Sequence, residues 1–160
     1  MRILGIDPGT ISAGYGVVER DGNRLRALTY GAIRVPRSIG FADRLRRIHE
    51  SLRAVIDEWR PDEAAIETLF GGKSIRSALH AGEGRGVAVL AVALADIPLA
   101  EYAPAEIKKA VVGQGRAAKV QVQRMVGVIL SLPTAPASTD AADALAIAIC
   151  HCQRRRFSSR

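Results

Sequence analysis

Four acidic residues that lie far apart in the sequence are each set in apolar surroundings. Asp7 ends the apolar run 2–6, Glu67 follows alanine and isoleucine, and Asp140 and Asp143 begin a stretch rich in alanine and leucine. Burying a carboxylate is costly unless its charge is compensated. We therefore interpret the four acids as members of one shared site.

A divalent cation would compensate the charges of such a site. Carboxylates a few ångströms apart repel one another, so several would hold protons near neutral pH. No His or Cys accompanies these acids, and an all-oxygen ligand set favours Mg²⁺, or Mn²⁺ in its place, over Zn²⁺. Two such ions about 4 Å apart promote in-line attack on phosphate, because one activates water and the other stabilises the leaving oxygen. The pattern indicates a nuclease, with two ions expected per active site.

Three of the four acids, taken alone, also have a structural interpretation. Asp7 precedes Pro8-Gly9, where an aspartate often stabilises a turn through its own backbone. Asp140 and Asp143 fall in the first turn of an expected helix, where acids are common. Glu67, at the end of a buried strand, has no such local explanation. For the other three acids the two interpretations stay open at this point.

The chain is basic, which predicts an anionic partner. It has 160 residues, a formal net charge of +7 and an isoelectric point near 10.1. Nucleic acid is the commonest anionic partner of a small basic domain, although a generally basic surface remains the alternative. We expect one domain over residues 1–153 and a basic, disordered tail over residues 154–160.

Membrane and secretory classes are not indicated. Residues 1–20 lack a basic start followed by an apolar stretch and a cleavage site. The longest apolar run, 87–95, is much shorter than the roughly 18 residues of a membrane span. Cys150 and Cys152 are spaced i,i+2 on an expected helix and therefore do not face each other. We expect a cytoplasmic protein with reduced thiols and no membrane association.

Hydrophobic periodicity and turn signals predict the elements that must position the acids. The expected strands are 2–7, 13–19, 25–35, 63–67 and 99–102, and the expected helices are 41–60, 74–95, one from 104, 118–130 and one from 139. A helix between two strands implies a parallel crossover. The predicted fold class is therefore α/β, with a five-stranded mixed sheet flanked by helices.

This arrangement predicts how the acids meet. Asp7 and Glu67 end two strands that are expected to be parallel neighbours, so both carboxylates emerge at the same edge of the sheet. Asp140 and Asp143 are spaced i,i+3 and project from one face of the last helix.

The ordered set of motifs along residues 2–152 resembles the RuvC family of Holliday-junction resolvases. The motifs are Gly5-Ile6-Asp7-Pro8-Gly9, Gly14-Tyr15-Gly16-Val17, Ala65-Ile66-Glu67 with Phe70, Ser77-Ala78-Leu79 with Gly82, Arg85-Gly86-Val87, Lys108, Val111-Val112-Gly113 with Gly115, Lys119, Gln121-Val122, and Asp140-Ala141-Ala142-Asp143-Ala144-Leu145-Ala146-Ile147-Ala148. Any single motif would be weak evidence, but the ordered set is specific. The sequence departs from the usual pattern at Thr68, Ser74 and Glu83-Gly84, in or beside the loop expected to touch the junction.

The resemblance implies an RNase H-like fold and a homodimer that cuts two opposed strands of four-way junction DNA. The catalytic and metal-binding acids of the family fall on Asp7, Glu67, Asp140 and Asp143. Its DNA-contacting lysines fall on Lys108 and Lys119, and its junction-probing aromatic falls on Phe70. The family acts with the RuvA and RuvB branch-migration proteins in recombination and repair.

Further interpretations concern the DNA and dimer surfaces. Lys73 and Arg76 would extend a track of phosphate contacts, and Phe70 would stack on an unpaired base or anchor its loop in the core. Gly82 and Gly86 lie four apart on one helix face, which predicts a close helix contact and makes that helix the candidate dimer surface.

Two rival functions remain. Asp7-Pro8-Gly9-Thr10 also resembles the first phosphate loop of actin-like sugar kinases, but those proteins need two such domains around the nucleotide. The second rival is a protein that binds junctions without cutting them and uses the acids only as caps.

Overall fold

The computed structural model describes residues 1–68 and 74–158, with only the backbone described at residue 76 and at residues 155–158. The strands are β1 (Arg2–Asp7), β2 (Ser12–Asp21), β3 (Arg24–Arg34), β4 (Glu63–Glu67) and β5 (Leu99–Tyr102). The helices are α1 (Phe41–Trp59), α2 (Ile75–Ala93), α3 (Pro104–Val112), α4 (Lys119–Ile129) and α5 (Thr139–Ser158).

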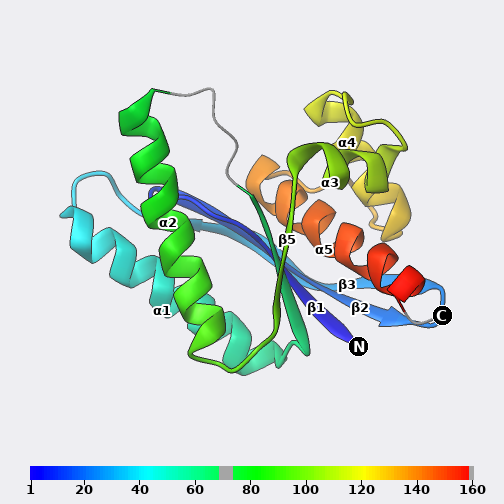
Figure 1. Cartoon of the computed structure of the whole chain (residues 1–160), viewed down its shortest axis with the longest axis horizontal. Helices are drawn as coiled ribbons and strands as arrows, with labels where there is room; N and C mark the ends of the chain where they lie inside the picture. Colours follow the sequence, from blue (N-terminus) through cyan, green and yellow to red (C-terminus); the bar gives the residue numbers. More distant parts are fainter. Residues whose placement is uncertain (69–73, 159–160) are drawn as a thin grey trace.

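The five strands form one mixed sheet in the order β3-β2-β1-β4-β5. Strand β1 is antiparallel to β2 and parallel to β4, and β4 is parallel to β5. Figure 1 shows α1 and α2 on one face of this sheet and α3, α4 and α5 on the other. The predicted α/β class and the mixed five-stranded sheet are confirmed.

The alternation of side chains along β1 and β4 decides which face carries the acids. Leu4 and Ile6 are buried in the core cluster beneath α1 and α2, whereas Ile3 belongs to the cluster beneath α3, α4 and α5. Because successive strand residues point to opposite faces, Asp7 shares the face of Ile3. In the same way Glu67 shares the face of Ala65, which also packs in the α5 cluster. Both predicted acids therefore point toward the face that α5 covers.

Helix α5 rests directly on the backbone of β1 and β2 because glycines lie beneath it. A Cβ placed on Gly14 would lie only 1.9 Å from the carbonyl oxygen of Asp140, and one on Gly5 only 2.0 Å from that of Ala144. No larger residue fits at these positions without moving the helix. The glycines thus set the height of α5 above the sheet and place Asp140 beside the end of β1.

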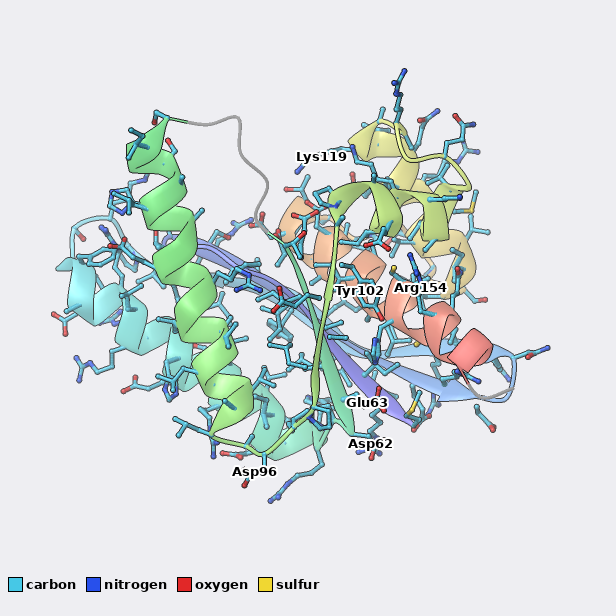
Figure 2. All side chains as sticks on the ribbon, viewed as in Figure 1. Asp62, Glu63, Asp96, Tyr102, Lys119 and Arg154 are labelled. Atoms are coloured by element: carbon cyan, nitrogen blue, oxygen red, sulfur yellow. The ribbon has the colours of Figure 1, made fainter. Side chains whose placement is uncertain are left out.

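A buried polar network ties α5 to the parallel part of the sheet. His151 on α5 lies 2.6 Å from Glu63 of β4 through Nε2 and 2.8 Å from the hydroxyl of Tyr102 through Nδ1. Glu63 and His151 are 8% and 6% exposed, so their mutual hydrogen bond offsets the cost of burying both. Figure 2 shows Glu63 and Tyr102 beside α5, with Arg154 near the Tyr102 ring.

Helix α5 extends further than expected. It runs to Ser158, whereas the sequence predicts that the domain ends at 153 and that residues 154–160 are disordered. Arg154 pairs with Glu106 at the start of α3 and lies over the Tyr102 ring, and these contacts favour continuation of the helix. Residues 159 and 160 lie outside the described residues.

The small residues of α2 also behave differently from the prediction. A Cβ on Gly82 or Gly86 would meet no described atom within 4 Å, so the predicted close contact is not made within the described chain. The close contact is at Gly84, where a Cβ would lie 2.7 Å from the carbonyl carbon of Gly9. Glycine at 84 therefore lets α2 approach the turn that follows Asp7.

Among the described helices, none combines the length and apolar character needed to cross a membrane.

Candidate active site

Asp7 and Glu67 lie side by side at one edge of the sheet. The parallel register pairs Ile6 with Ile66, so each acid is one residue beyond the last pair between β1 and β4. Neighbouring strands lie about 4.8 Å apart, which brings the two carboxylates to adjacent positions. The sequence-based prediction that these strands are parallel neighbours is confirmed.

A cavity of about 380 Å³ opens at this edge and collects most of the predicted site. Its lining includes the acids Asp7, Glu67 and Asp143 together with Lys108 and Lys119. The remaining lining is largely apolar and comes from α3, α4 and α5. Residues from β1, β4 and three helices, separated by more than a hundred positions in sequence, therefore share one pocket.

The electrostatics of the pocket disfavour a full set of negative charges. Burial, and then repulsion from Asp143, Glu67 and Asp140, raises the pKa of Asp7 to about 7, while Lys119 partly opposes this. Without a further compensating cation, Asp7 therefore keeps its proton to a much higher pH than an ordinary aspartate. A buried acid that is this strongly perturbed by its neighbours is typical of a functional site.

The side chain of Lys119 is largely exposed to solvent and contacts the acids at its end. Its Nζ donates a hydrogen bond to Oδ2 of Asp143 at 3.1 Å, and its side chain is 74% exposed. The hydrogen bond and charge of Asp143, followed by the charges of Asp7 and Glu67, raise the pKa of Lys119 despite partial desolvation. Figure 2 shows Lys119 near the start of α5, on the side of the molecule where β4 ends. The ammonium group of Lys119 can therefore contact both the acids and an incoming phosphate.

Asp140 is the predicted acid that does not line the cavity. It lies in the first turn of α5, and its Oδ2 accepts a hydrogen bond from Oγ of Ser12 at 2.5 Å. Of the three neighbouring carboxylates, it has the smallest effect on the pKa of Asp7. Sequence reasoning did not single out Ser12. The available signal was its place two residues before Gly14, on the same face of β2.

The donor chemistry of the site fits a hard divalent cation, but the side chains do not form a coordination sphere. Over residues 1–68 and 74–158, no three His, Cys, Asp or Glu side chains converge closely enough to hold a metal ion. The acids nevertheless offer only oxygen ligands, and burial together with repulsion among them raises the pKa of Asp7. Ligation would therefore require the carboxylates to lie closer together.

All five predicted DNA contacts remain predictions, and the side chains of three of them are not described. Phe70 and Lys73 lie outside the described residues, and Arg76 lies in the first turn of α2 with only its backbone described.

A second cavity of about 630 Å³ lies between α3 and the C-terminal part of α5, and none of the four predicted acids is among the described residues that line it. Glu106, which does line it, is already paired with Arg154, so the smaller cavity is the better candidate for catalysis.

Comparison with known sequences gives a match over nearly the whole chain. The family model described as crossover junction endodeoxyribonuclease RuvC matches residues 3–151. A crossover junction endodeoxyribonuclease RuvC from Chloroflexus aggregans is 53% identical over 151 residues, which cover 94% of this chain and 92% of that protein.

Comparison with solved structures agrees. T. thermophilus RuvC in complex with a Holliday junction substrate superposes with a TM-score of 0.92 at 34% identity, covering 99% of this chain and 97% of that one. The yeast mitochondrial Holliday junction resolvase Ydc2 gives a TM-score of 0.66 at 13% identity, over 97% of this chain and 80% of that one, and shows the shared fold alone. The expected RNase H-like α/β fold is confirmed.

Proposed function

Because the chain belongs to the RuvC family of crossover junction endodeoxyribonucleases, we propose that it resolves Holliday junctions by cutting two opposed strands of four-way junction DNA. The observation that carries this proposal is the cavity in which Asp7, Glu67 and Asp143 face Lys108 and Lys119. A relative with 34% identity has been solved with a Holliday junction substrate.

The described side chains suit the hydrolysis of a phosphodiester. Lys108 and Lys119 supply positive charge to the lining of the cavity, where phosphate oxygens of the DNA would lie. The neighbouring carboxylates would repel DNA unless their charge is neutralised. Lys119 lowers the pKa of Asp7, but burial and the three neighbouring carboxylates outweigh it, so that pKa stays raised.

We propose that Asp7, Glu67, Asp140 and Asp143 hold Mg²⁺, two ions per site, and that Mn²⁺ substitutes for it. When bound, these ions supply an activated water and stabilise the leaving oxygen. Ligation would displace the proton of Asp7, since coordination would replace that proton as the compensating charge. Lys119, bonded to Asp143, restrains that carboxylate at the cavity.

A two-fold homodimer would bring two identical active sites to a two-fold junction and account for paired nicks. Helix α2 supports this proposal because Ile75 and Leu79 are large, exposed apolar side chains. They line a shallow hollow of about 520 Å³ with Gly82, where an added Cβ would meet no described atom within 4 Å. By family resemblance, we also propose that the protein acts in the cytoplasm with RuvA and RuvB.

The decisive experiment is cleavage of a four-way junction with each strand labelled in turn. With Mg²⁺, the wild-type protein should nick two opposed strands, and a linear duplex of the same sequence should remain intact. Asp7→Asn should bind the junction without cutting it. If the wild type binds the junction but does not nick it, the result would favour a protein that binds junctions without cutting them. If it binds nucleotide and does not cleave the junction, the result would favour an actin-like kinase.

A further inference from the structure

Ser12 and Asp140 form a short hydrogen bond at the edge of the active site. Oγ of Ser12 lies 2.5 Å from Oδ2 of Asp140, and both side chains are partly buried. A carboxylate oxygen accepts hydrogen bonds from hydroxyl groups, so this bond ties the Asp140 side chain to β2. The bond links β2 to α5 across 128 residues of sequence.

Ser12 is itself held in a rigid frame. It is the first residue of β2 and is paired with Arg34 of β3. A Cβ on Gly9 would lie 2.0 Å from the carbonyl oxygen of Ser12, so the turn after Asp7 folds tightly against it. Ser12 therefore has a fixed position relative to Asp7.

Strand β2 contacts both the backbone and the side chain of Asp140. Ser12 and Gly14 lie on the same face of the strand because they are two residues apart. Gly14 leaves room for the backbone carbonyl of Asp140, and Gly14 is also the residue paired with Asp7. These two contacts fix the position of Asp140 beside the end of β1.

We propose that Ser12 is a positioning residue of the active site, whose hydroxyl fixes Oδ2 of Asp140 and leaves Oδ1 free for a divalent cation. The inference rests on the proposed function. Without the hydroxyl, repulsion from the other carboxylates would turn Asp140 toward solvent, and ligation would carry the added cost of ordering it again. Residues that orient metal ligands in this way contribute substantially to metal affinity.

The test compares Ser12→Ala, Ser12→Thr and the control Ser138→Ala in the full chain. Ser138 also lies at the start of α5, but its Oγ accepts a hydrogen bond from the backbone N–H of Ala141 and serves the helix start instead of the Asp140 carboxylate. Two quantities are measured: the Mg²⁺ concentration for half-maximal single-turnover cleavage, and the rise in Tm with Mn²⁺ in the absence of DNA.

Ser12→Ala should need about tenfold more of either ion, as for other residues that orient metal ligands. Ser12→Thr keeps the hydroxyl and should behave as the wild type. Ser138→Ala should lower Tm without changing the metal requirement. Junction affinity in EDTA should be the same for all three, which separates positioning from a general loss of fold.

A double-mutant cycle shows whether Ser12 acts through Asp140. In the Asp140→Asn background, Ser12→Ala should have little further effect on the Mn²⁺-dependent Tm shift; additive effects would overturn the inference. Suppose that the wild type cleaves junctions and responds to Mn²⁺ while Ser12→Ala shows the same metal requirement. That result would overturn the inference about Ser12 and leave the proposed function intact. A wild type that does neither would overturn the proposed function and this inference with it.

Discussion

Replacing Asp7 by asparagine should stabilise the metal-free protein while it abolishes cleavage. Burial and three neighbouring carboxylates raise the pKa of Asp7 from 3.8 to about 7. The ionised side chain is therefore disfavoured in the folded state, and an amide of the same shape removes the charge without leaving a cavity. Stability and activity should move in opposite directions at this residue.

The sign and size of the effect follow from proton linkage. Below pH 4, Asp7 is protonated in both the folded and the unfolded chain and costs nothing. Between pH 4 and pH 7 the unfolded chain releases its proton while the folded protein keeps it, so the free energy of unfolding falls as the pH rises. Above pH 7 the loss is complete, and at about 1.4 kcal/mol per pH unit it reaches at most about 4 kcal/mol.

Urea unfolding in EDTA at pH 5 and pH 8 measures this difference. Asp7→Asn should exceed the wild type in stability at both values, and by more at pH 8. Asp57→Asn is the matched control, because Asp57 is exposed in a surface pair with Arg53 and should change stability by less than about 0.5 kcal/mol. Saturating Mg²⁺ should reduce or reverse the advantage, since ligand binding stabilises only the protein that binds it. Equal stability of mutant and wild type at pH 8 would refute the account.

Three further predictions concern the elements around the site. Gly14→Ala should lower the free energy of unfolding by about 1–3 kcal/mol or more, because the new methyl group would clash with the Asp140 carbonyl. Urea unfolding measures this change, and an unchanged value would contradict direct packing of α5 on β2. Tyr102→Phe should cost about 1–3 kcal/mol in the same assay by removing a bond to the buried His151, with no change in the Mg²⁺ requirement for cleavage. Phe70→Ala should slow junction cleavage with little change in Tm, and a large fall in Tm would indicate a core anchor instead.

Much of the site was accessible from the sequence because its signals are local. A carboxylate at the end of an apolar strand is unusual whatever the strand packs against, so Asp7 and Glu67 could be identified from their immediate neighbours in the chain. The helical crossover between their strands predicted that the two are parallel neighbours, and the register agrees. The ordered motifs predicted the RuvC family, which the comparisons confirm.

The contacts made by glycine were not accessible in the same way. The spacing of Gly82 and Gly86 predicted a close helix contact, but the contact within the chain is at Gly84. Spacing identifies residues that share a helix face, whereas the choice of face depends on where the turn after Asp7 lies. Arg154 was likewise predicted to belong to a basic tail, and its pairing with Glu106 depends on α3 and α5 lying side by side.

The sequence by itself determined the residue types of the site, the order of the strands and helices, and the family. The tertiary structure decided how the acids meet: three of them line one cavity with two lysines, while Asp140 is held by Ser12 beside it. The physical reason is that hydrophobic periodicity and turn residues act over a few positions along the chain. The height of α5 above the sheet, by contrast, depends on backbone contacts between residues more than a hundred positions apart.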